Sequence, residues 1–137
     1  MFNYVLDACA LIAYLNNEEG AEKIERILIQ SFNKEVNVYI HINNLFEVHY
    51  DTVKRGAIKN ILEFFELIHD LPVEIVKQST NELLDMACLF KCNYRVSFAD
   101  SFALGLSKTR NAQLITSDHH EFDIIERDNG LNILWLR

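Results

Sequence analysis

The sequence predicts an α/β fold in which a mostly parallel sheet of about five strands lies between two layers of helices. Short apolar runs rich in Val, Ile and Leu alternate with longer segments of helical period, as in sheets whose strands are joined by helical crossovers. Only one proline and four glycines interrupt the 137 residues, which favours dense regular structure. We therefore expect a three-layer α/β/α sandwich that forms a single domain over residues 1–137.

Five apolar runs are the predicted strands: residues 2–6, 36–42, 73–76, 113–116 and 131–136. They read as nearly continuous apolar segments, which is typical of strands covered by helices on both faces. In an open parallel sheet, ligands bind beyond the carboxyl ends of the strands. Polar residues just after these runs are therefore the first candidates for a site.

Six stretches of helical period are the predicted helices: residues 8–16, 20–32, 44–55, 57–70, 79–92 and 98–110. Gly20 separates the first two, and Gly56 and Pro72 follow the ends of the third and fourth, as helix-terminating residues should. A further short helix is expected around Glu121 and Glu126.

The net charge and the cysteines of the chain argue against several classes of function. The formal net charge of −7 argues against nucleic-acid binding by the whole surface, but it leaves room for a local basic rim built from Lys54, Arg55 and Arg110. Three cysteines in apolar surroundings favour buried reduced thiols over a disulfide framework or a zinc site. No basic leader is visible, and no apolar run approaches the ~18 residues needed to span a bilayer, so we expect a cytoplasmic protein without membrane association.

Four acids stand at the ends of apolar runs: Asp7, Glu47, Asp100 and Asp118. Each also fits a role in helix capping, because Asp7 and Asp118 can be N-caps and the other two lie in patterns like a capping box. If the runs lie side by side, the acids converge, and each like-charge pair at roughly 5 Å would cost on the order of 3 kcal/mol. A hard divalent cation removes that cost, and oxygen ligands are those that Mg²⁺ or Mn²⁺ prefers.

Thr116 and Ser117 directly precede Asp118 and offer hydroxyl groups that could support the acid or position a metal-bound water; an ordinary turn at the strand end is the alternative. The aspartyl-phosphate phosphotransferases are disfavoured, because they need a second Asp two residues after the first and Cys9 occupies that place.

Four motifs in this order resemble the PIN-domain family, and particularly its small VapC-like toxin ribonucleases. They are Val5–Ile12, the Asn-rich segment leading to Glu47, Phe98–Leu104, and Leu114–Asp118 with Phe122. The resemblance covers essentially the whole chain. It implies a parallel-sheet α/β/α sandwich, a Mg²⁺- or Mn²⁺-dependent nuclease site and RNA as the substrate.

On that resemblance, Asp7, Glu47, Asp100 and Asp118 match the family's acidic quartet as metal ligands and catalytic residues. Lys54, Arg55 and Arg110 would then guide the RNA backbone. The family further implies a protein antitoxin and a homodimer. Cys9 departs from the usual Ser or Thr, and a thiol is the weaker hydrogen-bond donor.

Two alternatives stay open at the level of sequence. Asp123 is either an auxiliary acid or an exposed acid of the short helix around Glu121. The chain as a whole is either a nuclease or an inactive PIN-like module that binds RNA or protein and keeps its acids as helix caps.

Overall fold

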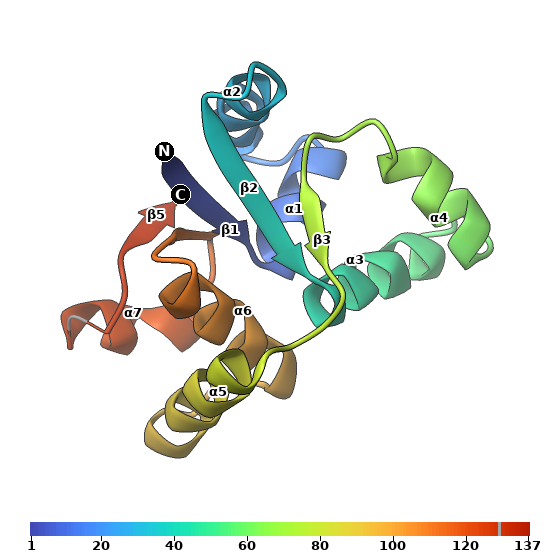
Figure 1. The fold of residues 1–137 in the computed structure, drawn as a ribbon. Coiled ribbons are helices and arrows are strands. Elements are labelled where there is room, and N and C mark those ends of the chain that lie inside the picture. Colours follow the sequence, from blue (N-terminus) through green and yellow to red (C-terminus); the bar gives the residue numbers. More distant parts are fainter. Residues whose placement is uncertain (129) are drawn as a thin grey trace.

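The computed structural model describes residues 1–128 and 130–137, and Figure 1 shows their arrangement. The elements in chain order are β1 (Phe2–Leu6), α1 (Ala8–Leu15), α2 (Ala21–Phe32), β2 (Val36–His41), α3 (Ile42–Lys54), α4 (Ile61–Ile68), β3 (Glu74–Val76), α5 (Asn81–Asn93), α6 (Phe98–Thr109), β4 (Gln113–Thr116), α7 (His119–Arg127) and β5 (Ile133–Trp135). In this part of the chain, no helix has both the length and the apolar character needed to cross a membrane.

The five strands form one sheet in the order β3-β2-β1-β4-β5, and every pair of neighbours is parallel. This confirms the predicted sheet and makes it wholly rather than mostly parallel. The chain builds outward from β1 to β3 and then returns to place β4 on the other side of β1. The strand order therefore reverses between β1 and β4, which is where ligands bind in open α/β sheets.

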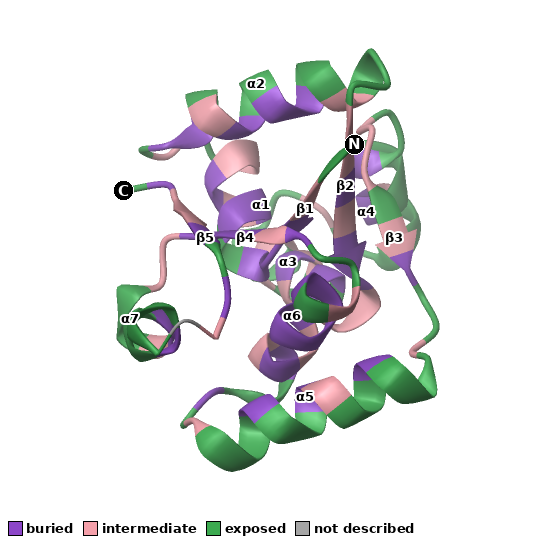
Figure 2. Cartoon of the chain, turned by 60° about the vertical axis from the view of Figure 1, so that its left-hand side comes forward, coloured by how far each residue is buried: buried purple, intermediate pink, exposed green. Residues whose placement is uncertain are grey.

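Successive residues of each strand enter different layers, as the two-residue period of a strand requires. Leu6, Ile40 and Ile115 pack with α1 to α4 on one face, whereas Val5 and Leu114 pack with α5, α6 and α7 on the other. Figure 2 shows the buried sides of α2 and α6 turned toward the sheet and the buried side of α5 turned toward α6. Since full burial of such an apolar side chain is worth about 1.5–3 kcal/mol, both faces of the sheet contribute to stability.

Four helix starts differ from the prediction: α2 and α5 begin at Ala21 and Asn81 rather than at residues 20 and 79, and the caps of α3 and α4 explain the other two. α3 begins at Ile42 rather than residue 44, because the Nδ1 atom of His41 accepts a hydrogen bond from the backbone N–H of Asn43 and caps the helix. The interpretation of Asn44 and Glu47 as a capping box is therefore wrong. The helix expected over 57–70 is confined to Ile61–Ile68, because Asn60 caps it by accepting a hydrogen bond from Glu63 N.

The helix pair α5 and α6 has the densest contacts between two elements in the fold. Gly105 of α6 allows this approach, because a Cβ atom there would lie 3.0 Å from the backbone nitrogen of Ala87. Cys88 and Cys92 point away from the pair, with their Sγ atoms 3.9 Å apart, and Cys9 is also exposed. The prediction of buried thiols was therefore wrong, because the face of α5 that meets α6 excludes both of its cysteines.

Candidate functional site

Asp7 and Asp118 occupy equivalent places at the carboxyl edge of the sheet, directly after β1 and two residues after β4. Asp7 is 1% exposed, and its Oδ1 accepts a hydrogen bond from Ala10 N at 2.8 Å, so it caps α1. Asp118 caps α7 in the same way by accepting from Glu121 N at 3.2 Å. Both residues are thus helix caps whose remaining oxygen atoms are available to other groups.

Asp100 and Glu47 come to the same edge from two helices on opposite faces of the sheet. Ser97 caps α6 through a hydrogen bond from Asp100 N to its Oγ, which places Asp100 in the first turn of that helix. Glu47 lies in the second turn of α3 and is half-buried. The amide of Asn44, which is fully buried, donates to Ala99 O at 3.2 Å and so ties the start of α3 to the start of α6.

Three carboxylates, those of Asp100, Asp118 and Glu121, offer oxygen atoms that lie within 4.8 Å of one another. Burial raises the pKa of Asp100 to about 6, and the charges of Glu47, Asp118 and Glu121 add to that rise. Burial also raises the pKa of Asp7 to about 7, with further contributions from Asp100 and Asp118. Of the four acids predicted from the sequence, the structure therefore brings Asp100 and Asp118 into one carboxylate cluster. Asp7 and Glu47 lie close enough for charge to act between them and this cluster, so negative charge is unfavourable at this acidic centre.

Two oxygen atoms at this centre have no protein partner by hydrogen-bond geometry. In the described ranges 1–128 and 130–137, the buried Asp7 Oδ2 and Glu121 Oε2 lack a hydrogen-bond donor. The Thr116 hydroxyl offsets part of the rise in the pKa of Asp7, but burial outweighs it. Buried polar atoms are rarely left without a partner, and a hard divalent cation would satisfy these oxygens. The donor set therefore fits Mg²⁺ or Mn²⁺.

The thiol of Cys9 lies close enough to all four predicted acids for their charges to affect its pKa. Although the residue is exposed, burial of its thiol raises the pKa of Cys9 to about 12, and the carboxylates of all four predicted acids add to the rise: Asp7, Asp118, Asp100 and Glu47. A thiol with such a pKa stays protonated at neutral pH and is a poor ligand for soft metals. The atoms that converge at the centre are carboxylate oxygens.

Thr116 and Ser117 differ in what they do. Thr116 is fully buried, and its Oγ1 accepts a hydrogen bond from Asp118 N at 3.0 Å, so it holds the backbone of that acid in place. Ser117 is half-buried and contributes its carbonyl oxygen to a turn with His119 N.

The predicted basic residues lie away from the acidic centre. Lys54 and Arg55 are at the far end of α3, where Lys54 lies over the Tyr50 ring and Arg55 forms an ion pair with Asp51 at 2.7 Å. Arg110 follows the last turn of α6, whereas Asp100 is in the first, and its guanidinium lies over the Tyr39 ring. Arg110 follows Asp100 by ten positions along α6 and its C-cap, which corresponds to roughly 15 Å.

Asp123 is engaged outside the acidic centre. His119 stacks on Trp135, with 3.8 Å between ring centroids, and its two ring nitrogens contact Asp123 at 2.8 Å and Arg137 O at 2.7 Å. This contact matches the reading of Asp123 as an exposed acid of the short helix. The histidine ring joins α7 to β5 and to the residues after it.

Glu121 is the member of the acidic cluster that sequence reasoning did not assign to the site. The signal was present in the spacing of Asp118 and Glu121, which was interpreted only as a capping box. A helix whose N-cap faces the acids brings its third residue to the same edge. Asn44 was interpreted only as part of an Asn-rich segment and of a loose capping box, and its buried contact with Ala99 depends on tertiary packing.

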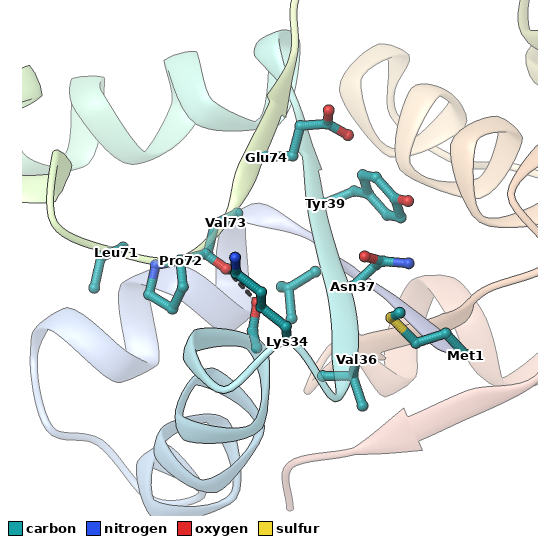
Figure 3. A pocket seen from close by; sticks show the side chains of 11 residues that line it. Met1, Lys34, Val36, Asn37, Tyr39, Leu71, Pro72, Val73 and Glu74 are labelled. Carbon is teal, nitrogen blue, oxygen red and sulfur yellow. Dashed lines mark hydrogen bonds between the residues drawn. The ribbon is translucent and has the colours of Figure 1, made fainter.

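A pocket lies at the edge of the sheet where the strands begin, opposite the acidic centre, and Figure 3 shows it from close by. It is lined by Met1, by the first residues of β2 and by residues 71–74, with Tyr39 and Lys34 among its side chains. None of the four predicted acids lines it. The acidic centre and this pocket are therefore separate features.

Comparison with known proteins identifies the fold and the family. The chain resembles a toxin-antitoxin complex structure from Klebsiella pneumoniae, with 13% identity, a TM-score of 0.72 and 98% of each chain covered. It also resembles VapBC2 from Rickettsia felis bound to a promoter DNA fragment, with 14% identity, a TM-score of 0.68 and coverage of 97% of this chain and 98% of that one. VapBC-1 from nontypeable Haemophilus influenzae matches with 16% identity, a TM-score of 0.67 and 98% of each chain covered.

At these identities the likeness to solved structures concerns the fold. A comparison with curated proteins gave no match. The family model of the PIN domain, in contrast, matches residues 4–127, which include the whole acidic centre. The match over this range and the parallel sheet with its acids at the carboxyl edge lead to the same conclusion: the chain belongs to the PIN-domain family.

Proposed function

We propose that this protein is a divalent-metal-dependent endoribonuclease and the toxin of a toxin-antitoxin pair. The observation that carries the proposal is the convergence of carboxylate oxygens within 4.8 Å of one another at the carboxyl edge of the sheet. Two buried carboxylate oxygens there, Asp7 Oδ2 and Glu121 Oε2, have no hydrogen-bond donor within the described residues. Family membership supports nuclease chemistry, and solved structures of the same fold are titled as toxin-antitoxin complexes.

The proposed ligands are Asp100, Asp118 and Glu121, with Asp7 and Glu47 bound directly or through water. When bound, Mg²⁺ or Mn²⁺ would lower the pKa of a coordinated water and neutralise charge on the phosphate. Thr116 would position Asp118 through its hydrogen bond to the backbone, and the caps of α1 and α7 would hold Asp7 and Asp118. The raised pKa values of Asp7 and Asp100 mean that cation binding would release protons near neutral pH.

The remaining parts of the proposal are a protein antitoxin that covers the acidic centre, a homodimer and a cytoplasmic location. Lys54 and Arg55 would contact RNA only where the strand runs along α3 beyond Glu47. Arg110 would need a strand that reaches the opposite edge of the sheet. We therefore rank the two α3 cations above Arg110 as RNA contacts.

The direct test incubates the purified protein, shown to be free of a copurified partner, with a mixed RNA pool in Mg²⁺ or Mn²⁺. We expect cleavage that disappears with chelator and in Asp100→Asn, but persists in the matched variant Asp85→Asn, whose acid is exposed on α5. A thermal melt in each metal provides a second readout, because a bound cation raises the melting temperature. Intact RNA together with a melting temperature indifferent to Mn²⁺ would favour the inactive binding module.

A further inference from the structure

An open cleft borders the acidic centre on the side of the connection between α5 and α6. It is lined by residues 91–97 and by Glu121, which also belongs to the acidic cluster. Glu121 therefore joins the cleft to the acidic centre. The cleft is a separate feature from the pocket of Figure 3 at the other edge of the sheet.

The cleft carries two positive side chains. Lys91 Nζ donates to Val96 O at 2.6 Å, which shapes the connection and leaves the ammonium with two further donors. Arg95 is exposed, and in residues 1–128 and 130–137 its guanidinium makes no ion pair. The nearby acid Asp128 accepts a hydrogen bond from the Tyr94 hydroxyl at 3.0 Å. Within the described residues Arg95 is therefore a cation without an ion-pair partner that lines the same cleft as Glu121, and a guanidinium fork suits phosphate oxygens.

An exposed aromatic ring follows the cleft in sequence. Phe98, the first residue of α6, is 68% exposed, two residues before Asp100. One side of its ring is supported by Phe102 in an edge-to-face contact at 5.1 Å, and Phe102 in turn packs on His41 at 4.7 Å. The rest of the ring faces solvent. A rigidly supported aromatic surface of this kind is what single-stranded nucleic-acid sites use to stack bases.

The turn that carries these residues is held in shape. Ser97 Oγ accepts a hydrogen bond from Asp100 N at 3.1 Å, and Ser101 Oγ donates to Phe98 O at 2.6 Å. Arg95, Phe98 and Asp100 therefore sit on one ordered segment. A cation for phosphate, an aromatic face for a base and an acid of the proposed metal centre follow each other within six residues.

We propose that this segment is a binding subsite for single-stranded RNA, in which Phe98 stacks on an unpaired base and Arg95 contacts a backbone phosphate next to the cleavage position. The proposal rests on the proposed nuclease function. In a duplex the faces of each base are covered by its neighbours, so only an unstacked base reaches Phe98. The subsite therefore selects single-stranded over double-stranded substrate.

Binding can be measured without cleavage in a parent protein that carries Asp100→Asn. Fluorescence anisotropy would follow a labelled short RNA, single-stranded or annealed to its complement, in Mg²⁺ at several salt concentrations. We expect Phe98→Ala to weaken single-strand binding by about 5- to 100-fold and leave duplex binding unchanged, while Phe98→Tyr keeps the parent affinity. The matched control is Phe32→Ala, an exposed phenylalanine at the end of α2.

Arg95→Gln tests the phosphate contact separately. One lost phosphate contact to a single strand lowers the slope of log affinity against log salt by about 0.7. The matched control Arg26→Gln, an exposed arginine on α2, is expected to leave the slope unchanged. Circular dichroism of each variant establishes that it is folded.

The outcomes separate the subsite from the function. If the wild type cleaves RNA and the parent binds it, but Phe98→Ala binds like Phe32→Ala, the stacking subsite is overturned and the nuclease stands. An unchanged salt slope in Arg95→Gln overturns the phosphate contact. If Phe98→Ala alters the sedimentation mass and not RNA binding, the ring belongs to a protein interface and the subsite is overturned. If the wild type does not cleave RNA and the parent does not bind it, both the nuclease function and the subsite are overturned.

Discussion

Replacing Asp7 with Asn is expected to stabilise the metal-free protein at neutral and alkaline pH. Asp7 is buried at the acidic centre, where burial raises its pKa from 3.8 to about 7. An amide has the same shape and carries no charge. Its oxygen can still accept the hydrogen bond from Ala10 N that caps α1.

The sign follows from proton binding. Between pH 3.8 and about 7 the folded protein holds the Asp7 proton and the unfolded chain does not, so the free energy of unfolding falls as pH rises. Each pKa unit corresponds to about 1.4 kcal/mol, so the full loss from this carboxyl is on the order of 4 kcal/mol. Stability from this group is complete below pH 3.8 and is lost as pH passes about 7. The Asp7→Asn variant does not lose this free energy of unfolding, because its amide carries no titrating proton.

Urea unfolding followed by circular dichroism, with chelator present, would measure this between pH 5 and pH 8. We expect Asp7→Asn to exceed the wild type by an amount that grows across this range, whereas the exposed-acid control Asp85→Asn follows the wild type. In Mn²⁺ at a hundred times its Kd the advantage of Asp7→Asn at pH 8 should shrink by about 2.7 kcal/mol, because the cation stabilises the protein that binds it.

This reasoning would be refuted if the unfolding free energies of the variant and the wild type changed with pH in parallel. If the unfolding free energies of Asp7→Asn and the wild type keep a constant difference from pH 5 to pH 8 in chelator, the Asp7 carboxyl does not titrate in the way its burial requires. A lower stability of Asp7→Asn at every pH would show that the charged form contributes a contact that the amide cannot replace.

Other predictions concern the cation, the thiol and a backbone turn. Glu121→Gln is expected to reduce the rise in melting temperature that Mn²⁺ produces, whereas Glu25→Gln on α2 should not; an equal rise in both would remove Glu121 from the cation site. Alkylation of Cys9 at pH 8, followed by peptide mass spectrometry, should be slow because its pKa is about 12, and faster once Mn²⁺ neutralises the acids; a rate unaffected by the metal would contradict this. Gly20→Ala should lower the free energy of unfolding by about 1–3 kcal/mol more than Gly56→Ala. Both glycines have positive φ, but only at Gly20 would a Cβ lie 2.7 Å from a neighbouring side chain, so equal losses in urea melts would refute that contact.

The local pattern of the chain determined most of the secondary structure. Apolar runs predicted all five strands, because a strand buried on both faces needs continuous apolar side chains. Gly56 correctly predicted where α3 ends. The error at the start of α3 arose because His41, a residue type not expected in that role, supplies the cap.

The sequence by itself also placed Asp7 and Asp118 at one edge of the sheet, since parallel strands end on the same side. Only the tertiary structure decided the rest of the centre. The return of the chain that sets β4 beside β1 brings Asp118 near Asp7, and the packing of α6 brings Asp100 beside Asp118 and Glu121. These contacts join residues distant along the chain. Local propensity and periodicity act over a few residues, whereas strand order and helix packing are set by which faces the whole chain buries together.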